Sequence, residues 1–271
     1  MSREIMKRYS IGAKKSLGQN FLVDEIKVQE IADVLDISEK NIIEVGPWYG
    51  ALTQKLASKK PKSLYLVELD RDMISILEER KVLWEIPTSE IDFQIFYQDV
   101  LEFIPAFWEK NYSVIANIPY YITSPILRHF LYDIPNLPES MLLLMQKDVA
   151  DKILWWKKKK SSVLSLFVEK KCHVTHKIFV PKESFLPVPK VESSVLLFEI
   201  HEKYRDIDDD SFLELIKKWF SEPRKKCIKN LVKWGYDFIK ISRFLYENNF
   251  DENTRAEDMS IDVWCQLCEI L

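Results

Sequence analysis

The architecture of this chain follows from the stretch Asn41-Ile-Ile-Glu-Val-Gly-Pro-Trp-Tyr-Gly50. Its first five residues form a mainly apolar run, which is typical of a buried strand. The glycines that follow favour a tight turn, and residues 51–59 predict a helix. A strand, a glycine turn and a helix make the first half of a βαβ unit, so this stretch predicts a parallel sheet with crossover helices.

The same alternation continues along most of the chain. Further buried strands are predicted at 63–68, 93–97, 112–116, 141–145 and 193–200, and helices at 25–35, 72–84, 123–132 and 148–156. After the acidic run at 206–210 the pattern is helical with short breaks. We therefore expect an α/β fold, a Rossmann-like sheet with helices on both faces, followed by a small C-terminal α-helical domain. The predicted domains are residues 1–205 and 206–271.

Composition excludes several classes of protein. The 271 residues carry a formal net charge of −3 and are 47% hydrophobic, which describes a globular chain and not a uniformly basic nucleic-acid-binding protein. Four cysteines in a chain of this length do not make a disulfide framework. The N-terminus has no apolar segment of signal-peptide length, and no run reaches the length of a membrane span. These features predict a cytoplasmic protein.

A metal site is not expected. The segment Cys172-His-Val-Thr-His176 has metal-binding residue types, but no fourth ligand stands at a sensible spacing. An alternating strand explains this segment better.

Four of the predicted strands are followed by residues that suit a ligand: Gly46, Glu68, Asp99 and Asn117. Ligands of open α/β sheets bind at the carboxyl ends of the strands. Glu68 stands about 20 residues past the glycine turn, where an acid accepts hydrogen bonds from ribose hydroxyls in nucleotide-binding sheets. The sequence contains no Gly-x-Gly-x-x-Gly motif, so a pyrophosphate has no cradle. This favours a nucleoside ligand without phosphates over NAD.

A second motif, Asn117-Ile118-Pro119-Tyr120, ends the strand predicted at 112–116. Proline cannot donate to a sheet ladder, so the strand stops there. The amide oxygen of Asn117 and a backbone carbonyl, that of Ile118, can each accept one hydrogen from the exocyclic amine of a base, and Tyr120 can stack on its ring. The motif is similar to the Asn-(Asp)-Pro-Pro-Tyr class of amino-methyltransferases. The alternative is a plain strand-ending turn, in which asparagine and proline are common.

Basic residues cluster near the N-terminus and again in the stretch from Lys217 to Lys233, where Trp219 and Phe220 interleave with them. A basic helical face beside a catalytic domain predicts contacts to a phosphate backbone. The alternative is a solvated helix face. The predicted RNA-binding residues are Lys14, Lys15, Arg224, Lys225, Lys226 and Lys229.

From about Lys14 to the C-terminus the chain resembles the small-subunit (16S-type) ribosomal RNA adenine N6,N6-dimethyltransferases. The matching motifs, in order, are Gln19-Asn-Phe-Leu22, Glu44-Val-Gly-Pro47, Val67-Glu-Leu-Asp70, Gln98-Asp99, Asn117-Ile-Pro-Tyr120, Phe185-x-Pro-x-Pro-Lys-Val191 and Arg255-Ala-Glu-Asp-Met-Ser260. The macrolide-resistance RNA dimethylases share the first six of these motifs. The basic stretch and the block at Arg255 are more similar to the small-subunit group.

The resemblance implies a cofactor, a substrate and roles for single residues. S-adenosylmethionine would be held by Asn20, Leu22, Gly46, Glu68, Asp99 and Asn117. Glu68 would take the ribose and Asp99 the adenine amine of the cofactor. Tyr120 and Phe185 would sandwich the target adenine, with Phe185 presented by a stiff, proline-rich loop.

The implied reaction is dimethylation of two adjacent adenosines near the 3′ end of small-subunit rRNA, by a monomer that acts on a precursor of the small ribosomal subunit. Two alternatives stay open: a large-subunit rRNA as the substrate, and a non-catalytic ribosome-assembly factor with the same fold.

Two positions depart from the family pattern. Pro223 stands before Arg224 where the family usually has glutamine, and Trp48 follows Gly-Pro where the family usually has another glycine. Tryptophan tolerates positive φ badly, so the turn should take an ordinary conformation or carry strain. A ring of this size would fill the methionine pocket of the cofactor. We therefore expect the indole to point away from the carboxyl edge of the sheet, or to lie flat over the rim of the pocket.

Overall fold

The computed structural model describes residues 2–14, 17–108, 111–154, 160–221, 227–251 and 253–271. The chain divides into two compact units. The sheet unit contains Met1–Ala150 and Val174–Ile200, and the helical unit contains Asp151–His173 and His201–Leu271. The predicted boundary places residues 151–173 in the first domain, whereas the described residues of this range, 151–154 and 160–173, belong to the helical unit.

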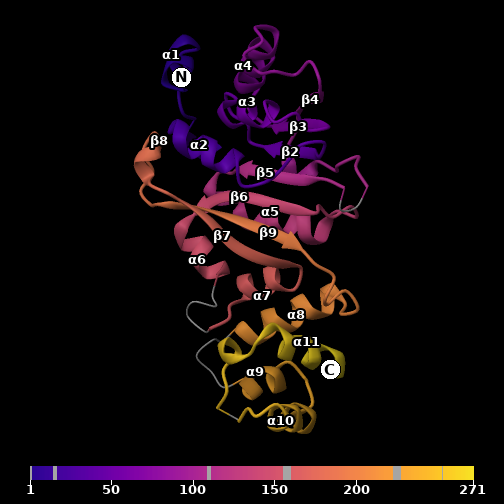
Figure 1. Ribbon diagram of the computed structural model, residues 1–271. Helices are drawn as coiled ribbons and strands as arrows, with labels where there is room; N and C mark the ends of the chain where they lie inside the picture. Colours follow the sequence, from indigo (N-terminus) through magenta and orange to yellow (C-terminus); the bar gives the residue numbers. More distant parts are fainter. Residues whose placement is uncertain (1, 15–16, 109–110, 155–159, 222–226, 252) are drawn as a thin grey trace. The chain divides into compact units, whose positions relative to one another are not determined.

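The sheet unit is built on a seven-stranded sheet with the strand order β4-β3-β2-β5-β6-β9-β7 (Figure 1). The strands β4, β3, β2, β5 and β6 are parallel to one another, and β9 is antiparallel to β6. The bounds are β2 Asn41–Val45, β3 Ser63–Glu68, β4 Asp92–Tyr97, β5 Ser113–Asn117, β6 Ser140–Gln146, β7 Cys172–Val180 and β9 Ser193–Ile200. The six buried strands predicted are therefore confirmed to within about a residue at each end, and the alternating strand expected at 172–176 is confirmed but continues to Val180.

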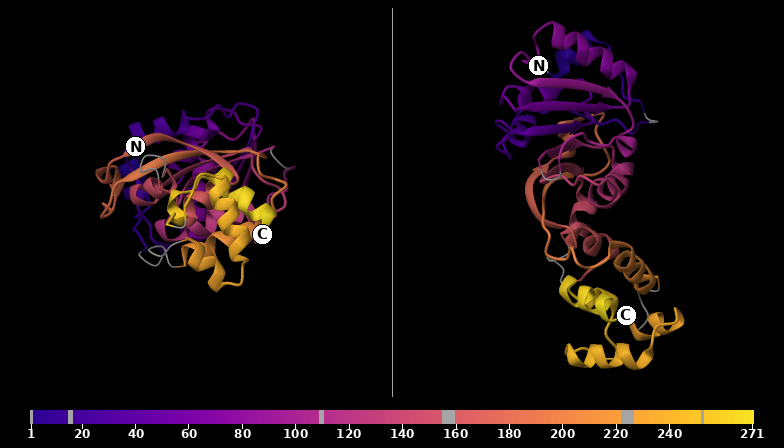
Figure 2. Two further views of the ribbon diagram at one scale, coloured as in Figure 1. Left: turned by 90° about the horizontal axis from the view of Figure 1, so that it is seen from below. Right: turned by 90° about the vertical axis from the view of Figure 1, so that its right-hand side faces the viewer.

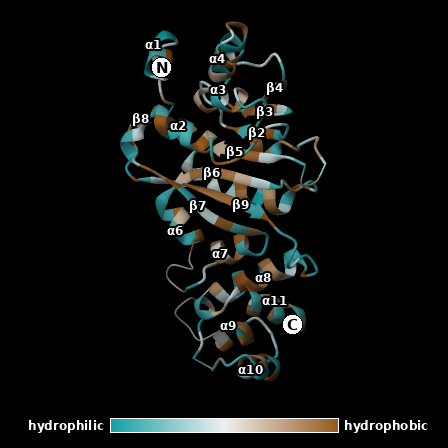
Figure 3. Cartoon of the chain, in the orientation of Figure 1, coloured by the Kyte–Doolittle hydropathy of each residue, from teal (hydrophilic) through white to brown (hydrophobic). Residues whose placement is uncertain are grey.

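Helices cover both faces of this sheet. Successive residues of a strand point to opposite faces, and both Ile42 and Ile43 of β2 are fully buried. Figure 3 shows that apolar residues also predominate along β5, β6 and β9. The flanking helices are α2 Glu25–Ala32, α3 Ala51–Ala57, α4 Arg71–Val82, α5 Thr123–Arg128, which continues into the π-helical turn His129–Asp133, and α6 Lys147–Ile153. The predicted Rossmann-like α/β fold is confirmed.

The basic N-terminal segment contains regular structure. It forms helix α1 (Ser2–Arg8) and a short strand, β1 (Phe21–Leu22). Strand β1 pairs antiparallel with β8 (Phe185–Leu186), so that Leu22 lies opposite Phe185. This pairing joins segments more than 160 residues apart and could not be inferred from local sequence patterns.

The helical unit confirms the predicted C-terminal α-helical domain. Its helices are α7 Val163–Glu169, α8 Asp209–Phe220, α9 Cys227–Lys233, α10 Phe238–Glu247 and α11 Ile261–Ile270, and Figure 2 shows them from two further directions. Trp219 and Trp264 pack edge to face at its centre, with ring centroids 4.4 Å apart. Buried Lys170 follows α7, donates to the carbonyl of Ile207 and pairs with Asp209 at the start of α8. These contacts explain why α7 belongs to this unit.

Candidate active site

The carboxyl ends of four parallel strands meet at one edge of the sheet. Val45, the last residue of β2, lies opposite Val67 of β3 on one side and Ala116 of β5 on the other. Glu68 at the end of β3 lies opposite Tyr97 of β4. The residues that follow these positions are therefore neighbours, as the sequence predicted.

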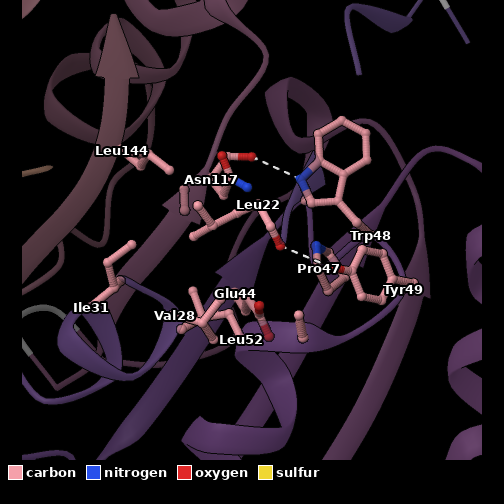
Figure 4. Close-up of a pocket in the computed structure, with 13 residues that line it drawn as sticks. Leu22, Val28, Ile31, Glu44, Pro47, Trp48, Tyr49, Leu52, Asn117 and Leu144 are labelled. Atoms are coloured by element: carbon pink, nitrogen blue, oxygen red, sulfur yellow. Dashed lines mark hydrogen bonds between the residues drawn. The ribbon is translucent and has the colours of Figure 1, made fainter. Parts of the chain in front are cut away.

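Two pockets open at this edge. We call the first the Glu68 pocket; its lining includes Gly46, Trp48, Glu68, Gln98, Val100 and Pro119. We call the second the Glu44 pocket; its lining includes Leu22, Glu44, Gly46, Trp48, Asn117 and Leu144, and Figure 4 shows these side chains. Gly46 and Trp48 are the residues that the two linings have in common.

The carboxylate of Glu68 is held by backbone donors. Its Oε1 accepts from the N–H of Leu69 and of Asp70 at 2.8 and 2.9 Å, and its Oε2 accepts from the N–H of Trp48 at 3.2 Å. Burial raises the pKa of Glu68 above its usual value, and these three donors oppose that shift. Three hydrogen bonds leave a carboxylate with further lone-pair capacity, so Glu68 can still accept from a ligand hydroxyl.

Glu44 is a functional candidate that the sequence reasoning missed. Its side chain is buried in the middle of β2, and Oε2 has no hydrogen-bond partner of acceptable geometry among the described residues. The pKa of Glu44 is raised to about 8, mainly because the group is buried; the Thr53 hydroxyl opposes this shift, and the charge of Glu68 contributes to it. A lone carboxyl in an otherwise apolar strand was the signal that could have identified it. Such an orphaned oxygen suits a cationic or N–H-bearing ligand group.

Trp48 adopts a strained backbone conformation, which is one of the two outcomes that the sequence allowed. Its φ is 55°, in the left-handed region. Its side chain is only 7% exposed and packs edge to face on Phe21, with ring centroids 5.5 Å apart. The indole Nε1–H donates to the backbone carbonyl of Asn117 at 3.1 Å (Figure 4).

The expectation that the indole points away from the sheet edge is therefore wrong. A flat position over the rim is also wrong, since the ring is buried and lines both pockets. The hydrogen bond to Asn117 and the contact with Phe21 hold the ring inward. Gly50 supports the turn with a φ of 84°, and a Cβ added there would lie 2.8 Å from a methyl carbon of Leu77.

The end of β5 forms the predicted turn. Asn117 is its last residue, Ile118 is buried, and the Pro119 carbonyl accepts from the N–H of Ile122 at 3.2 Å. Tyr120 begins a 3₁₀ turn, Tyr120–Ile122, and its side chain lies outside the described part of the structure. Asn117 lines the Glu44 pocket and Pro119 lines the Glu68 pocket, so the turn touches both.

The remaining predicted cofactor residues lie close to this edge, but they differ in their hydrogen-bond partners and in whether they line a pocket. Leu22 lines the Glu44 pocket, and its carbonyl accepts from the Tyr49 hydroxyl at 2.9 Å. The Asn20 side-chain amide donates to the Gly18 carbonyl at 3.2 Å. The Asp99 carboxylate caps a 3₁₀ turn by accepting from the N–H of Leu101 at 2.9 Å. It is the residues on either side of Asp99, Gln98 and Val100, that line the Glu68 pocket.

The expected presentation of Phe185 is wrong. The residue lies in β8, opposite Leu22, and its side chain is 2% exposed within the hydrophobic core. The two prolines that follow Phe185 predicted a stiff loop that presents its ring. Pairing with β1 instead turns the ring inward, so Phe185 cannot stack on a base from this position.

The predicted RNA-binding residues are only partly described. The Lys14 ammonium pairs with Asp70 and Asp72, each at 2.6 Å, so it is engaged within the sheet unit. Lys15 and residues 224–226 lie outside the described ranges, as does the side chain of Lys229. Within the described ranges there is no cluster of metal-ligating side chains and no helix long and apolar enough to cross a membrane.

Comparisons with known proteins agree with this geometry. The model of the ribosomal RNA adenine dimethylase family matches residues 11–271. A ribosomal RNA small subunit methyltransferase A of Fusobacterium nucleatum is 34% identical, over 95% of this chain and 97% of the relative. Its counterpart in Mycoplasmopsis pulmonis is 36% identical, over 91% and 94%.

Solved structures support the fold. A dimethyladenosine transferase from Plasmodium falciparum superposes with a TM-score of 0.75 at 22% identity, over 91% of this chain and 95% of that one. The 23S rRNA methyltransferase ErmE superposes with a TM-score of 0.72 at 21% identity, over 92% and 98%.

Proposed function

The chain belongs to the ribosomal RNA adenine dimethylase family, and from this premise we propose that it dimethylates two adjacent adenosines near the 3′ end of small-subunit rRNA. The observation that carries the proposal is the intact Asn117-Ile118-Pro119-Tyr120 turn at the end of β5, beside both pockets. The small-subunit assignment rests on the relatives that cover nearly the whole chain. The enzyme acts as a monomer, in the cytoplasm, on a precursor of the small subunit.

The residues of the site fit S-adenosylmethionine, which supplies a methyl group on a sulfonium. Glu68 would hold the ribose hydroxyls, and Gln98, Asp99 and Val100 would border the adenine. Glu44 would face the cationic amino-acid end, since its buried Oε2 has no partner among the described residues. Asn20, Leu22 and Gly46 would border the same end. A carboxyl group in each pocket thus matches a ligand with polar groups at both ends.

The turn at the end of β5 would prepare the adenine amine for attack. The amine is a poor nucleophile, because its lone pair is delocalised into the ring. The Asn117 amide oxygen and the Ile118 carbonyl would each accept one of its hydrogens, which favours a pyramidal nitrogen with an available lone pair. Placing that nitrogen in line with the methyl group supplies much of the remaining acceleration. The base has to leave its stack to reach this point, and stacking on Tyr120 would offset the cost.

RNA would be held by the basic stretch that contains Arg224, Lys225, Lys226 and Lys229, together with Lys14 and Lys15. Charge reversal of Lys225, Lys226 and Lys229 is expected to weaken RNA binding and to flatten its salt dependence, by roughly one unit of log–log slope for each phosphate that the variant no longer binds. Filter binding over a range of salt concentrations measures this slope. Lys240→Glu, an exposed change in the helical unit, is the matched control. An unchanged slope in the triple variant would show that the basic stretch is only solvated.

Methyl incorporation into unmethylated small subunits, large subunits and protein-free rRNA tests the proposed substrate. Incorporation into small subunits alone, or far above the other two, is the expected result. Incorporation mainly into large subunits would favour the macrolide-resistance type of enzyme. No incorporation into any of the three would favour a non-catalytic assembly factor.

A further inference from the structure

The two pockets at the sheet edge share one side chain in their linings. Gly46 and Trp48 line both of them, and Gly46 contributes no side chain. The indole of Trp48 therefore forms the side-chain wall between Glu68 on one side and Glu44 and Asn117 on the other. Figure 4 shows the ring directed at Asn117 above the Glu44 pocket.

The wall is held by three contacts. The indole Nε1–H donates to the Asn117 carbonyl at 3.1 Å, the ring packs on Phe21, and the backbone N–H donates to Glu68 at 3.2 Å. There is little other space between the two strand ends, because a Cβ added at Gly46 would lie 3.2 Å from the Asn117 carbonyl oxygen. A ligand that extends from one pocket to the other must therefore pass through the position of the indole.

S-adenosylmethionine is such a ligand if the proposed function is correct. With its ribose at Glu68, its amino-acid end has to extend past Gly46 toward the orphaned oxygen of Glu44. An ammonium group arriving there could take over the Asn117 carbonyl that the indole N–H occupies, so one donor would replace another. The closed position of Trp48 keeps this partly buried carbonyl paired when no cofactor is present.

We propose that Trp48 is a gate within the cofactor site: its indole must leave the Asn117 carbonyl before the amino-acid end of the cofactor can reach the Glu44 pocket. The adenosine end needs no such movement. The apparent cofactor affinity is then the intrinsic affinity multiplied by the fraction of molecules in which the gate is open. This inference rests on the proposed function, because it concerns the same cofactor.

Two ligands allow binding at the two ends of the site to be measured separately. S-adenosylhomocysteine has both ends, whereas 5′-methylthioadenosine lacks the amino-acid end. Titration calorimetry of Trp48→Gly is expected to show S-adenosylhomocysteine bound roughly 10–100-fold more tightly than by the wild type, as for removal of a closed state populated at about 90–99%. The affinity for 5′-methylthioadenosine should change by less than about twofold.

Trp84→Gly is the matched control. Trp84 also has a positive φ, 60°, but it is 73% exposed, outside both pockets. Its replacement relieves the same kind of backbone strain without opening the site, so neither ligand should change in affinity. Trp48→Phe keeps a ring but removes the N–H, and it should bind S-adenosylhomocysteine about threefold more tightly or better. This variant also decides the question if Trp48→Gly does not fold.

Equal or weaker binding of S-adenosylhomocysteine by the folded Trp48 variants, with 5′-methylthioadenosine still bound, would overturn the gate and leave the proposed function intact. A similar gain in affinity for both ligands would also overturn the gate, because binding of the adenosine end would then depend on Trp48. Binding of neither ligand by wild type and variants would overturn the gate and the proposed function together.

Discussion

The ends of β2 and β5 lie side by side in the sheet but differ in how they agree with the family. The β5 end keeps the family motif Asn117-Ile118-Pro119-Tyr120. The β2 end keeps Gly46 and Gly50 but carries Trp48 where the family usually has glycine. In the proposed mechanism the β5 end acts through the chemical identity of a side chain, whereas the β2 end controls access through the volume of one. The difference teaches that neighbouring strand ends can serve one site in two ways.

The largest effect is expected at the β5 end. Asn117→Ala removes one acceptor for the adenine amine, and the turnover number at saturating substrate should fall on the order of 10²–10³-fold, as for loss of one preorganised polar group in an active site. The affinity for S-adenosylhomocysteine should change only a few-fold, because the backbone carbonyl of Asn117 remains. Single-turnover methyl transfer and calorimetry measure the two quantities. Full activity of the variant would remove Asn117 from the mechanism.

A smaller effect is expected from Glu44, within β2. Its pKa of about 8 lies above that of a carboxyl in the unfolded chain, so the folded state binds the extra proton. Stability from this group is therefore present at low pH and is lost as the pH rises from about 4.5 toward 8. Urea unfolding should show a decline of roughly 1 kcal/mol per pH unit in this window, since one pKa unit corresponds to about 1.4 kcal/mol.

Glu44→Gln provides the comparison for that decline. The variant cannot titrate at this position, so the difference in unfolding free energy between it and the wild type should change by about 2 kcal/mol between roughly pH 5.5 and 7.5. Taking the difference cancels the groups that titrate in both proteins. A constant difference across this range would mean that Glu44 is already ionised in the folded state.

The smallest effect is expected at the end of β3. Glu68→Gln keeps the size of the side chain but weakens its hydrogen bonds to ribose hydroxyls, and affinity for 5′-methylthioadenosine should fall about tenfold. Glu199→Gln, at an exposed carboxylate of β9 outside both pocket linings, is the control and should bind normally. Unchanged affinity in Glu68→Gln would place the ribose elsewhere and would weaken the argument for a gate between two pockets.

Local patterns were sufficient for the regular parts of the fold. The apolar runs of β2, β3 and β9 were predicted with their observed bounds, because a strand buried on both faces has a continuous apolar sequence. The positions of Gly46, Glu68 and Asn117 at one edge followed from the rule that parallel strands share a direction.

What the sequence could not provide depends on tertiary contacts. The orientation of Trp48 is set by Phe21 and the Asn117 carbonyl, neither of which is near it in the chain. The burial of Phe185 depends on its pairing with Leu22. Glu44 was visible in the sequence, but its missing partner is a property of the packed interior.

The central claim is that the Asn117 turn presents an adenine amine for transfer of two methyl groups. The most direct test incubates unmethylated small subunits with S-adenosylmethionine and either the wild type or Asn117→Ala, digests the rRNA to nucleosides and quantifies N6,N6-dimethyladenosine by mass spectrometry. The account predicts about two dimethyladenosines per rRNA with the wild type and almost none with the variant in the same time. A different methylated nucleoside, or equal dimethyladenosine with Asn117→Ala, would contradict it.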